Sequence, residues 1–263
     1  MMTPTHEYNA TIVRRDDLHE GLAMLWIAPD SGEFAPFHPG QFVAVGRIVE
    51  SPPAGRVLVK RSYSIGSSAN RRESVQLFVV HVDDGEFTSW LFAQRVGARV
   101  WLAPKASGGF TLQGFERGKN LALVSTGTAV APYVSMYRTY LDDPPWDRIV
   151  IINGVRFVAD LGFREELDAA AARDSRLVYI PTTTREPSGS PWIGLRGRVN
   201  DVMEPQQFRT LAGFDLVPSQ CHVYICGNPS MIEDVEAMVV ARGFKKHTPG
   251  HPGTLHMEKY WTD

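Results

Sequence analysis

The pattern of apolar residues changes near residue 115, and this change constrains the fold more than any other feature of the sequence. Before it, short apolar segments are separated by turn residues such as Asp30-Ser31-Gly32 and Pro39-Gly40. After it, short apolar runs alternate with longer segments of helical periodicity. The chain has 263 residues, enough for two cores. We therefore expect two domains, residues 1–115 and 116–263.

The first part reads as closely spaced β-strands. Turn residues separate six segments with strand character, and one short helical stretch is expected near 89–95. Such a series predicts a small antiparallel β-barrel with Greek-key connections. The expected strands are residues 11–14, 21–28, 41–47, 57–65, 75–82 and 98–102.

The second part alternates strands with helices. The runs 121–125, 148–153, 177–182 and 222–226 suit parallel strands that are buried on both faces. Helices are expected at 131–141, 163–172, 199–211 and 230–242. This alternation predicts a doubly wound α/β sheet, so that the whole chain is an α+β protein of two domains. Ligands of such sheets bind at the carboxyl ends of the strands, beside a topological switch point.

Composition excludes several classes of protein. The chain has 27 Lys and Arg against 29 Asp and Glu, a formal charge of −2, which argues against nucleic acid as a partner. Cys221 and Cys226 are the only cysteines, too few for a disulfide framework or an iron–sulfur cluster, and we expect no metal site. No signal peptide is visible, and the apolar runs are too short to cross a bilayer. We expect a cytoplasmic protein with no membrane partner.

The first motif, Ser125-Thr126-Gly127-Thr128-Ala129-Val130-Ala131-Pro132, follows the first strand of the second part. Gly127 allows the backbone to approach a phosphate closely, and Pro132 suits the start of a helix, whose amino terminus favours anions. An ordinary strand-to-helix turn is the alternative. The motif is neither G-x-G-x-x-G nor a P-loop.

The second motif, Arg61-Ser62-Tyr63-Ser64-Ile65, lies on a strand of the predicted barrel. Arg61 and Tyr63 point to one side of the strand, and Ser62 and Ser64 point to the other. Arg61 could hold a phosphate bidentately while Tyr63 stacks on a flat ring. Without the other motifs, a half-exposed strand that carries an Arg and a Tyr is the first explanation of these residues.

Two further motifs lie near the end of the chain. In Cys226-Gly227-Asn228-Pro229-Ser230-Met231, Asn228 can cap a helix and Gly227 permits a close approach; Cys226 alone reads as a small buried residue. The segment Glu258-Lys259-Tyr260-Trp261 places two aromatic residues beside a carboxylate. These aromatic rings could dock on the core or cover the flat rings of a ligand.

Taken together, the four motifs resemble the bacterial-type ferredoxin/flavodoxin–NADP+ reductase family, over nearly the whole chain from Phe37 to Trp261. The strand motif is similar to the family's R-x-Y-S flavin signature, and the motif at Cys226 matches its C-G-N-P-x-M pattern. The loop at Gly127 resembles its pyridine-nucleotide loop, and the chain end resembles an aromatic terminus. Two departures are Ala129, where a second Gly is common, and Thr262-Asp263, which follow Trp261.

The resemblance implies FAD in the barrel. Arg61 would hold the pyrophosphate, Tyr63 would stack on the isoalloxazine, and Ser64 would hydrogen-bond near N5. Tyr260 would shield the other flavin face, and Trp261 would stack on adenine, although which ring lies nearer the isoalloxazine stays open. The implied FAD residues are Arg61, Ser62, Tyr63, Ser64, Val80, His81, Glu86, Phe87, Thr88, Thr128, Tyr260 and Trp261.

The resemblance also implies NADP(H) in the second domain. No acidic residue that would bind a ribose 2′-hydroxyl follows Thr182, and guanidinium groups suit a 2′-phosphate. Arg185 and Arg198 are assigned to that phosphate, with Arg156 as a further contact. The implied NADP residues are Gly127, Arg156, Arg185, Arg198, Gly227, Asn228 and Met231.

The implied activity is hydride transfer from NADPH to FAD, followed by single-electron transfer to an acidic carrier, ferredoxin or flavodoxin, by a monomeric enzyme. Ser64, Cys226, Glu258 and Tyr260 would be the catalytic residues, with Tyr260 displaced by the nicotinamide. Exposed cations are candidates for docking the carrier: Arg71, Arg72, Arg95, Arg99 and Lys105. The alternatives are a reductase component of an oxygenase, a reductase of free flavin or ferric chelates, and a non-catalytic nucleotide sensor.

Overall fold

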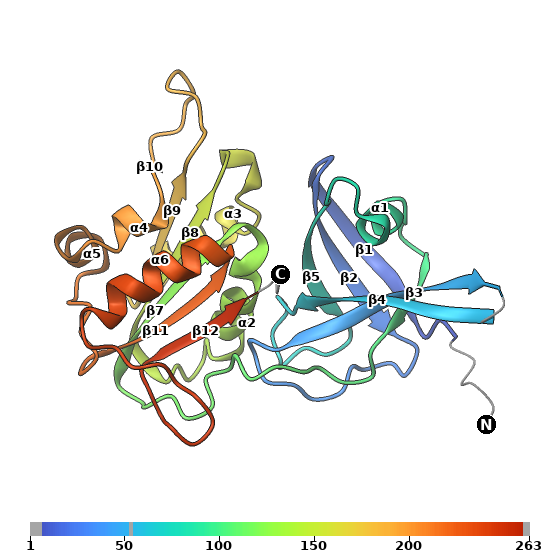
Figure 1. Cartoon of the computed structure of the whole chain (residues 1–263), viewed down its shortest axis with the longest axis horizontal. Helices are drawn as coiled ribbons and strands as arrows, with labels where there is room; N and C mark the ends of the chain where they lie inside the picture. Colours follow the sequence, from blue (N-terminus) through green and yellow to red (C-terminus); the bar gives the residue numbers. More distant parts are fainter. Residues whose placement is uncertain (1–6, 53–54, 260–263) are drawn as a thin grey trace. The chain divides into compact units, whose positions relative to one another are not determined.

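The computed structural model describes residues 7–52 and 55–259 and divides the chain into two compact units (Figure 1). The first unit runs to Thr111 and also takes in Val134–Thr139. The second consists of Leu112–Tyr133 and the residues from Tyr140 onward. The expected boundary between residues 115 and 116 stays a prediction, but the inclusion of Val134–Thr139 in the first unit was not expected.

The first unit contains a six-stranded antiparallel sheet in the order β4-β3-β6-β1-β2-β5. A bridge between Ile65 and Leu77 joins the end of β4 to β5, which closes the barrel. All six predicted strands form, so the antiparallel barrel is confirmed. They are β1 (Ala10–His19), β2 (Leu22–Pro29), β3 (Phe42–Ser51), β4 (Gly55–Ser64), β5 (Val75–Val80) and β6 (Arg99–Leu102).

Helix α1 (Glu86–Phe92) begins three residues before the predicted start at Ser89, so that prediction was wrong in its bounds. The turn before it explains the difference. The Thr88 hydroxyl accepts the Val82 N–H (3.1 Å) and donates to the Gly85 carbonyl (3.1 Å). The chain therefore enters the helix directly from the turn, and Phe87 and Leu91 pack into the barrel core.

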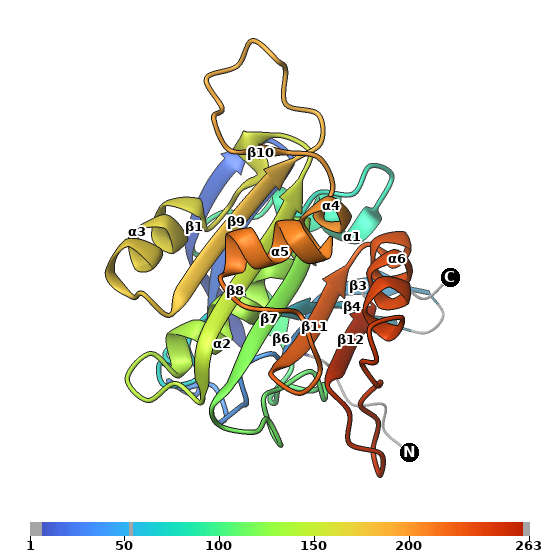
Figure 2. The ribbon, with the colours of Figure 1, turned by 90° about the vertical axis from the view of Figure 1, so that its left-hand side faces the viewer.

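The second unit contains a six-stranded parallel sheet in the order β10-β9-β8-β7-β11-β12. In Figures 1 and 2, α4, α5 and α6 cover one face, and α3 and the start of α2 cover the other, which confirms the doubly wound fold. The strands are β7 (Lys119–Thr126), β8 (Trp146–Val155), β9 (Leu177–Thr183), β10 (Leu195–Arg196), β11 (Cys221–Gly227) and β12 (Leu255–Lys259). The helices are η1 (Gly127–Val130), α2 (Ala131–Thr139), η2 (Val158–Asp160), α3 (Arg164–Arg173), α4 (Val199–Val202), α5 (Pro205–Ala212) and α6 (Pro229–Val240).

The topological switch point lies between β7 and β11. From β7 the chain adds β8 and β9 on one side, and β11 pairs with β7 on the other. Both faces of β7 are buried: Ala122 and Val124 pack in the cluster with α4–α6, while Leu121 and Leu123 alternate to the opposite face. The switch point therefore lies at the end of two strands whose central residues are buried on both faces.

One prediction for the second unit was wrong, and two of its strands were missed. The helix expected at 199–211 is two helices, because Pro205 has no N–H to continue α4 and instead starts α5. β10 and β12 were not predicted at all. β10 has only two residues, and β12 carries polar residues that do not resemble a buried parallel strand.

The segment Val134–Thr139 is bonded to the first unit by its polar side chains. The Arg138 guanidinium donates to the Gly66 carbonyl (2.7 Å) and to Gln76 Oε1 (2.5 Å). The Ser135 hydroxyl donates to the Ser67 carbonyl (2.7 Å). Among the described helices, none combines the length and the apolar character required to cross a bilayer.

Candidate functional site

On the barrel, Arg61 and Tyr63 lie on the β4 face that also carries Val43 and Val45 of β3, their partners in the strand register. Tyr63 is largely buried, and this burial raises the pKa of its hydroxyl. The hydroxyl has no hydrogen-bond partner among the described residues. A buried hydroxyl without a partner is costly, so this atom is suited to meet a polar group of a ligand.

Phe87 of α1 lies close to both residues. Its ring centroid is 6.4 Å from that of Tyr63 and 5.9 Å from Arg61 Cζ. Ser62 is exposed and, by alternation, lies on the other face of β4 with the buried Ser64. The structure therefore brings together Arg61, Tyr63 and Phe87 from the predicted set.

The remaining predicted FAD residues of the first unit lie around the start of α1. Val80 is exposed at the end of β5. The His81 ring lies 3.2 Å from the Ser89 hydroxyl and packs edge-on against Phe92. The Thr88 hydroxyl is already engaged in the turn at Val82.

Arg47 is a residue that the sequence analysis missed. It lies opposite Val59 in the β3–β4 register, two residue pairs along from Arg61, and so shares the face of Arg61 and Tyr63. Its guanidinium donates to Glu86 Oε2 at 3.2 Å. No motif marks Arg47; only the alternation Val43, Val45, Arg47 along the expected strand could have placed it on this face.

In the second unit, the predicted loops meet at the switch point. The Asn228 N–H donates to the Thr126 hydroxyl at 2.9 Å, which joins the end of β11 to the end of β7. Gly227 has φ +135°, and a Cβ there would lie 2.3 Å from Thr126 Oγ1. The two backbones can approach this closely only because residue 227 is glycine.

The helices that leave these strands begin at the same place. The Asn228 side chain accepts the N–H groups of Ser230 (3.0 Å) and Met231 (3.3 Å) and caps α6, as the sequence predicts. Gly127, at φ +57°, starts η1, and the half-buried Thr128 follows it. Amide groups from two helical starts therefore gather at the switch point, an arrangement that suits a diphosphate.

Arg156, Arg185 and Arg198 follow the neighbouring strands β8, β9 and β10. The Arg185 N–H donates to the Arg156 carbonyl at 2.8 Å, so the first two lie side by side. Gly197, bonded to Thr183 and Thr182, leads into Arg198. The structure thus carries the three predicted arginines at one edge of the sheet.

The carboxylates near these arginines are engaged elsewhere. Each accepts a backbone N–H: Asp160 from Phe157 (2.9 Å), Glu186 from Val158 (2.9 Å) and Asp201 from Arg198 (2.8 Å). Within residues 7–52 and 55–259, none of the three guanidinium groups forms an ion pair. This edge therefore carries positive charge that is available to an anion.

Cys226 and Glu258 lie opposite each other on β11 and β12, with Cys226 Sγ 4.0 Å from Glu258 Oε2. Burial raises the pKa of the Glu258 carboxyl to about 7. The group can therefore hold or release a proton near neutral pH. Tyr260 and Trp261 lie outside the described residues.

At the other end of the same two strands, three histidine rings pack together. His256 stacks between Tyr224 (4.1 Å between centroids) and His247 (4.6 Å), and its Nε2 lies 3.3 Å from His222 Nδ1. Burial and the neighbouring histidines lower the pKa of His256 to about 3, so it is neutral at physiological pH. In the described part of the chain, no group of His, Cys, Asp or Glu is arranged to hold a metal ion.

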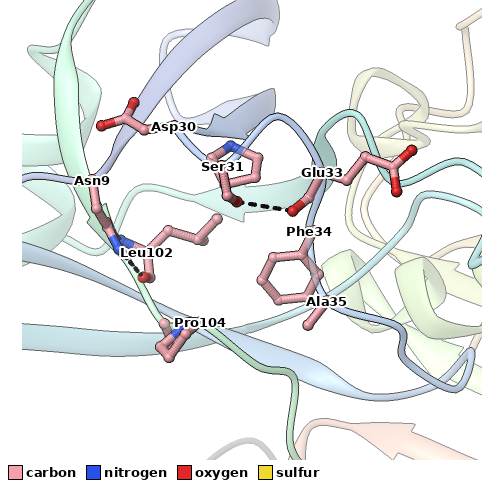
Figure 3. A pocket seen from close by; sticks show the side chains of 10 residues that line it. Asn9, Asp30, Ser31, Glu33, Phe34, Ala35, Leu102 and Pro104 are labelled. Carbon is pink, nitrogen blue, oxygen red and sulfur yellow. Dashed lines mark hydrogen bonds between the residues drawn. The ribbon is translucent and has the colours of Figure 1, made fainter.

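A cavity of about 240 Å³ opens in the first unit beside Asn9, Asp30 and Phe34 (Figure 3). Its polar groups are satisfied: Asn9 bonds to the Leu102 backbone, and Asp30 bonds to Arg99. None of the predicted site residues lines it. The cavity is therefore not a candidate active site.

Comparison with known proteins finds relatives that cover most of the chain. Residues 123–237 match the family model described as the oxidoreductase NAD-binding domain. The chain is 32% identical to ferredoxin–NADP reductase A of Sorangium cellulosum over 232 residues, covering 85% of this chain and 80% of that protein. It is 29% identical to ferredoxin–NADP reductase of Pseudomonas aeruginosa, covering 86% and 88%.

A solved structure has the same fold. The ferredoxin NADP+ reductase from Neisseria gonorrhoeae, crystallised with bound FAD and NADP, superposes with a TM-score of 0.82 at 24% identity, over 96% of this chain and 98% of that chain. The two units and the sequence similarity lead to one assignment. This chain belongs to the ferredoxin–NADP reductase family.

Proposed function

We propose that this protein is a ferredoxin/flavodoxin–NADP reductase, which transfers electrons between NADP(H) and a one-electron carrier protein through FAD. The observation that carries the proposal is the edge of the parallel sheet with Arg156, Arg185 and Arg198. Three guanidinium groups without carboxylate partners suit a phosphate monoester and distinguish NADP from NAD. Family membership supports the same activity.

The barrel face fits FAD. Arg61 would hold the pyrophosphate, and the Tyr63 hydroxyl would meet a hydroxyl of the cofactor's chain, which would satisfy its missing hydrogen bond. Tyr63 would also pack against the flavin ring, with Ser64 near its reactive edge. FAD, when bound, supplies the chemistry that accepts a hydride from NADPH and passes electrons on singly.

The second unit binds and orients the nucleotide. Thr126, Gly227 and Asn228 would surround the pyrophosphate, and Arg185 and Arg198 would hold the 2′-phosphate with Arg156 beside them. Cys226 would contact the nicotinamide. Glu258 can anchor the carboxamide or move a proton at its carboxyl oxygen, because its pKa of about 7 allows both protonation states near neutral pH.

The carrier would dock through exposed cations of the first unit. Arg72 and Arg99 are less suitable than expected, since Arg72 pairs with Glu33 at 2.8 Å and Arg99 pairs with Asp30. Arg71, Arg95 and Lys105 are exposed and remain candidates. We further propose a cytoplasmic monomer; Cys221 and Cys226 are buried and are not joined in a disulfide, which is compatible with a reducing compartment.

An anaerobic titration of the purified protein with NADPH, and separately with NADH, tests the proposal through the flavin absorbance. We expect rapid bleaching by NADPH and a weak response to NADH. The reduced protein is then mixed with ferredoxin, flavodoxin, free flavin and a ferric chelate. Faster reoxidation by the protein carriers supports the reductase named here, and faster reoxidation by free flavin or chelate contradicts it. A protein that is colourless and takes up no FAD would refute the cofactor assignment.

A further inference from the structure

Arg47 and Arg61 form a diagonal pair on neighbouring strands. In the β3–β4 register, Val45 pairs with Arg61 and Arg47 pairs with Val59, so both arginines lie on one face of the sheet. Diagonal neighbours of this kind lie about 7–8 Å apart, within the reach of two long side chains. Two guanidinium groups can therefore act on one ligand.

Both side chains extend toward the same short segment. The Arg47 guanidinium contacts Glu86, and Arg61 Cζ lies 5.9 Å from the ring centroid of Phe87, the next residue. The two positive charges are thus directed to one place on the barrel. A ligand with more than one negative charge would neutralise both.

The partner of Arg47 in the structure is a weak one. The Arg47 side chain is only 20% exposed, whereas the Glu86 side chain is 88% exposed, and their contact is 3.2 Å long. An ion pair with a largely solvated carboxylate contributes little. Arg47 Nε is also buried without a hydrogen-bond partner among the described residues. Arg47 is therefore a largely desolvated cation whose hydrogen-bonding capacity is incompletely used.

Another arginine of the same hairpin shows the contrast. Arg56 faces Glu50 directly across the strands, 3.8 Å away, and its side chain is 42% exposed. Arg56 is an ordinary surface cation with a partner across the hairpin. Arg47 differs from Arg56 in three ways: it is more buried, it is directed toward Glu86, and it shares a face of the sheet with Arg61.

We propose that Arg47 is a second arginine of the FAD pyrophosphate site, and that Glu86 holds its guanidinium until the diphosphate displaces the carboxylate. The proposal rests on the proposed function, since it assumes that Arg61 holds the same pyrophosphate. A diphosphate presents several oxygens to two guanidinium forks, which a single carboxylate does not. Glu86 then acts as a competitor for the cofactor through its side chain.

The test is flavin binding to the full-length protein freed of FAD, measured by calorimetry or by flavin fluorescence. Arg47→Met keeps an unbranched stem and removes the charge. We expect it to weaken FAD binding by about tenfold or more, and to change riboflavin binding, which involves no phosphate, by less than about twofold. Arg47→Lys should recover part of the FAD affinity, and the matched control Arg56→Met should change neither affinity.

A second variant tests the displaced carboxylate. Glu86→Gln should strengthen FAD binding several-fold. This gain should be smaller in the Arg47→Lys background, because the ammonium group of Lys lacks the fork with which Arg binds the Glu86 carboxylate or the diphosphate. This pair keeps the proposal testable if Arg47→Met does not fold.

The outcomes distinguish failure of this proposal from failure of the proposed function. Equal loss of FAD and riboflavin binding in Arg47→Met would assign Arg47 a structural role and overturn the inference. Unchanged FAD binding would also overturn it while leaving the proposed function intact. If the wild-type protein binds no FAD, the proposed function itself fails.

Discussion

The two units direct arginines to phosphate in different ways. In the first unit, Arg47 and Arg61 project from paired strands, and a nearby carboxylate, Glu86, contacts one of them. In the second unit, Arg156, Arg185 and Arg198 stand on loops, and the neighbouring carboxylates accept backbone N–H groups instead.

The difference shows two solutions to one problem, which is to place cations without letting the protein's own anions neutralise them. A strand fixes the position of a side chain through its register but does not control the surrounding carboxylates. A loop has unpaired N–H groups, and carboxylates that bind these stabilise the loop and leave the guanidinium groups for the ligand. We therefore expect that replacing one arginine affects ligand binding more selectively in the second unit than in the first.

The largest expected effect comes from Gly227→Ala, which would disrupt the second unit alone. The Cβ would lie 2.3 Å from Thr126 Oγ1 at φ +135°, so the loops at the switch point must separate. We expect kcat/KM for NADPH to fall by about 100-fold or more, while FAD content stays normal. Gly189→Ala, with open space around the added methyl group, is the control. Normal turnover in Gly227→Ala would show that the close approach is not needed for nucleotide binding.

Arg198→Ala should have a smaller and more selective effect. Removal of a charge-assisted contact to the 2′-phosphate should raise KM for NADPH by about 10–100-fold and change KM for NADH by less than about twofold. Arg173→Ala, at the exposed end of α3, is the control. Steady-state kinetics with both nucleotides measures the difference; similar losses for NADPH and NADH would refute the 2′-phosphate assignment.

The smallest effect is expected at Glu258 of the second unit. Burial, and not an ion pair, shifts the pKa of this carboxyl. Its pKa of about 7 lies above the ordinary value of 4.5, so the folded state favours the neutral form. This contribution to the free energy of unfolding is present below pH 4.5 and is lost as the pH rises to 7. Glu258→Gln should therefore be more stable than wild type by about 1–3 kcal/mol at pH 8, and equal to it near pH 4.

Urea unfolding across this pH range measures that prediction. Met257→Leu, on the same strand, removes no titrating group and should follow the wild-type pH profile. A stability difference that is the same at every pH would mean that packing, and not the carboxyl proton, distinguishes the Gln variant.

The sequence predicts the fold well where the pattern is periodic. Each strand of the barrel and the four central strands of the parallel sheet follow from short apolar runs between turns. β12 was missed because an edge strand needs fewer apolar residues, and Leu255–Lys259 reads as mixed. The break at Pro205 was visible in the sequence, and its missing N–H should have divided the predicted helix.

The candidate site was predictable in part. Glycines and prolines mark the loops at Gly127 and Gly227, because special backbone conformations require them. Arg47 has no such mark, since its place beside Arg61 depends on how two strands pair. Nor does the sequence reveal that Asp160, Glu186 and Asp201 bind backbone N–H groups, because those bonds depend on loop geometry.

The assignment of Val134–Thr139 to the first unit has a consequence for protein synthesis. The barrel strands end at Leu102, but Arg138 and Ser135, which bond to residues 66, 67 and 76, leave the ribosome more than thirty residues later. By then β7 has also been made. The barrel therefore completes its hydrogen bonds only after the first strand of the next unit has emerged, and a fragment cut at residue 115 would lack part of its own structure.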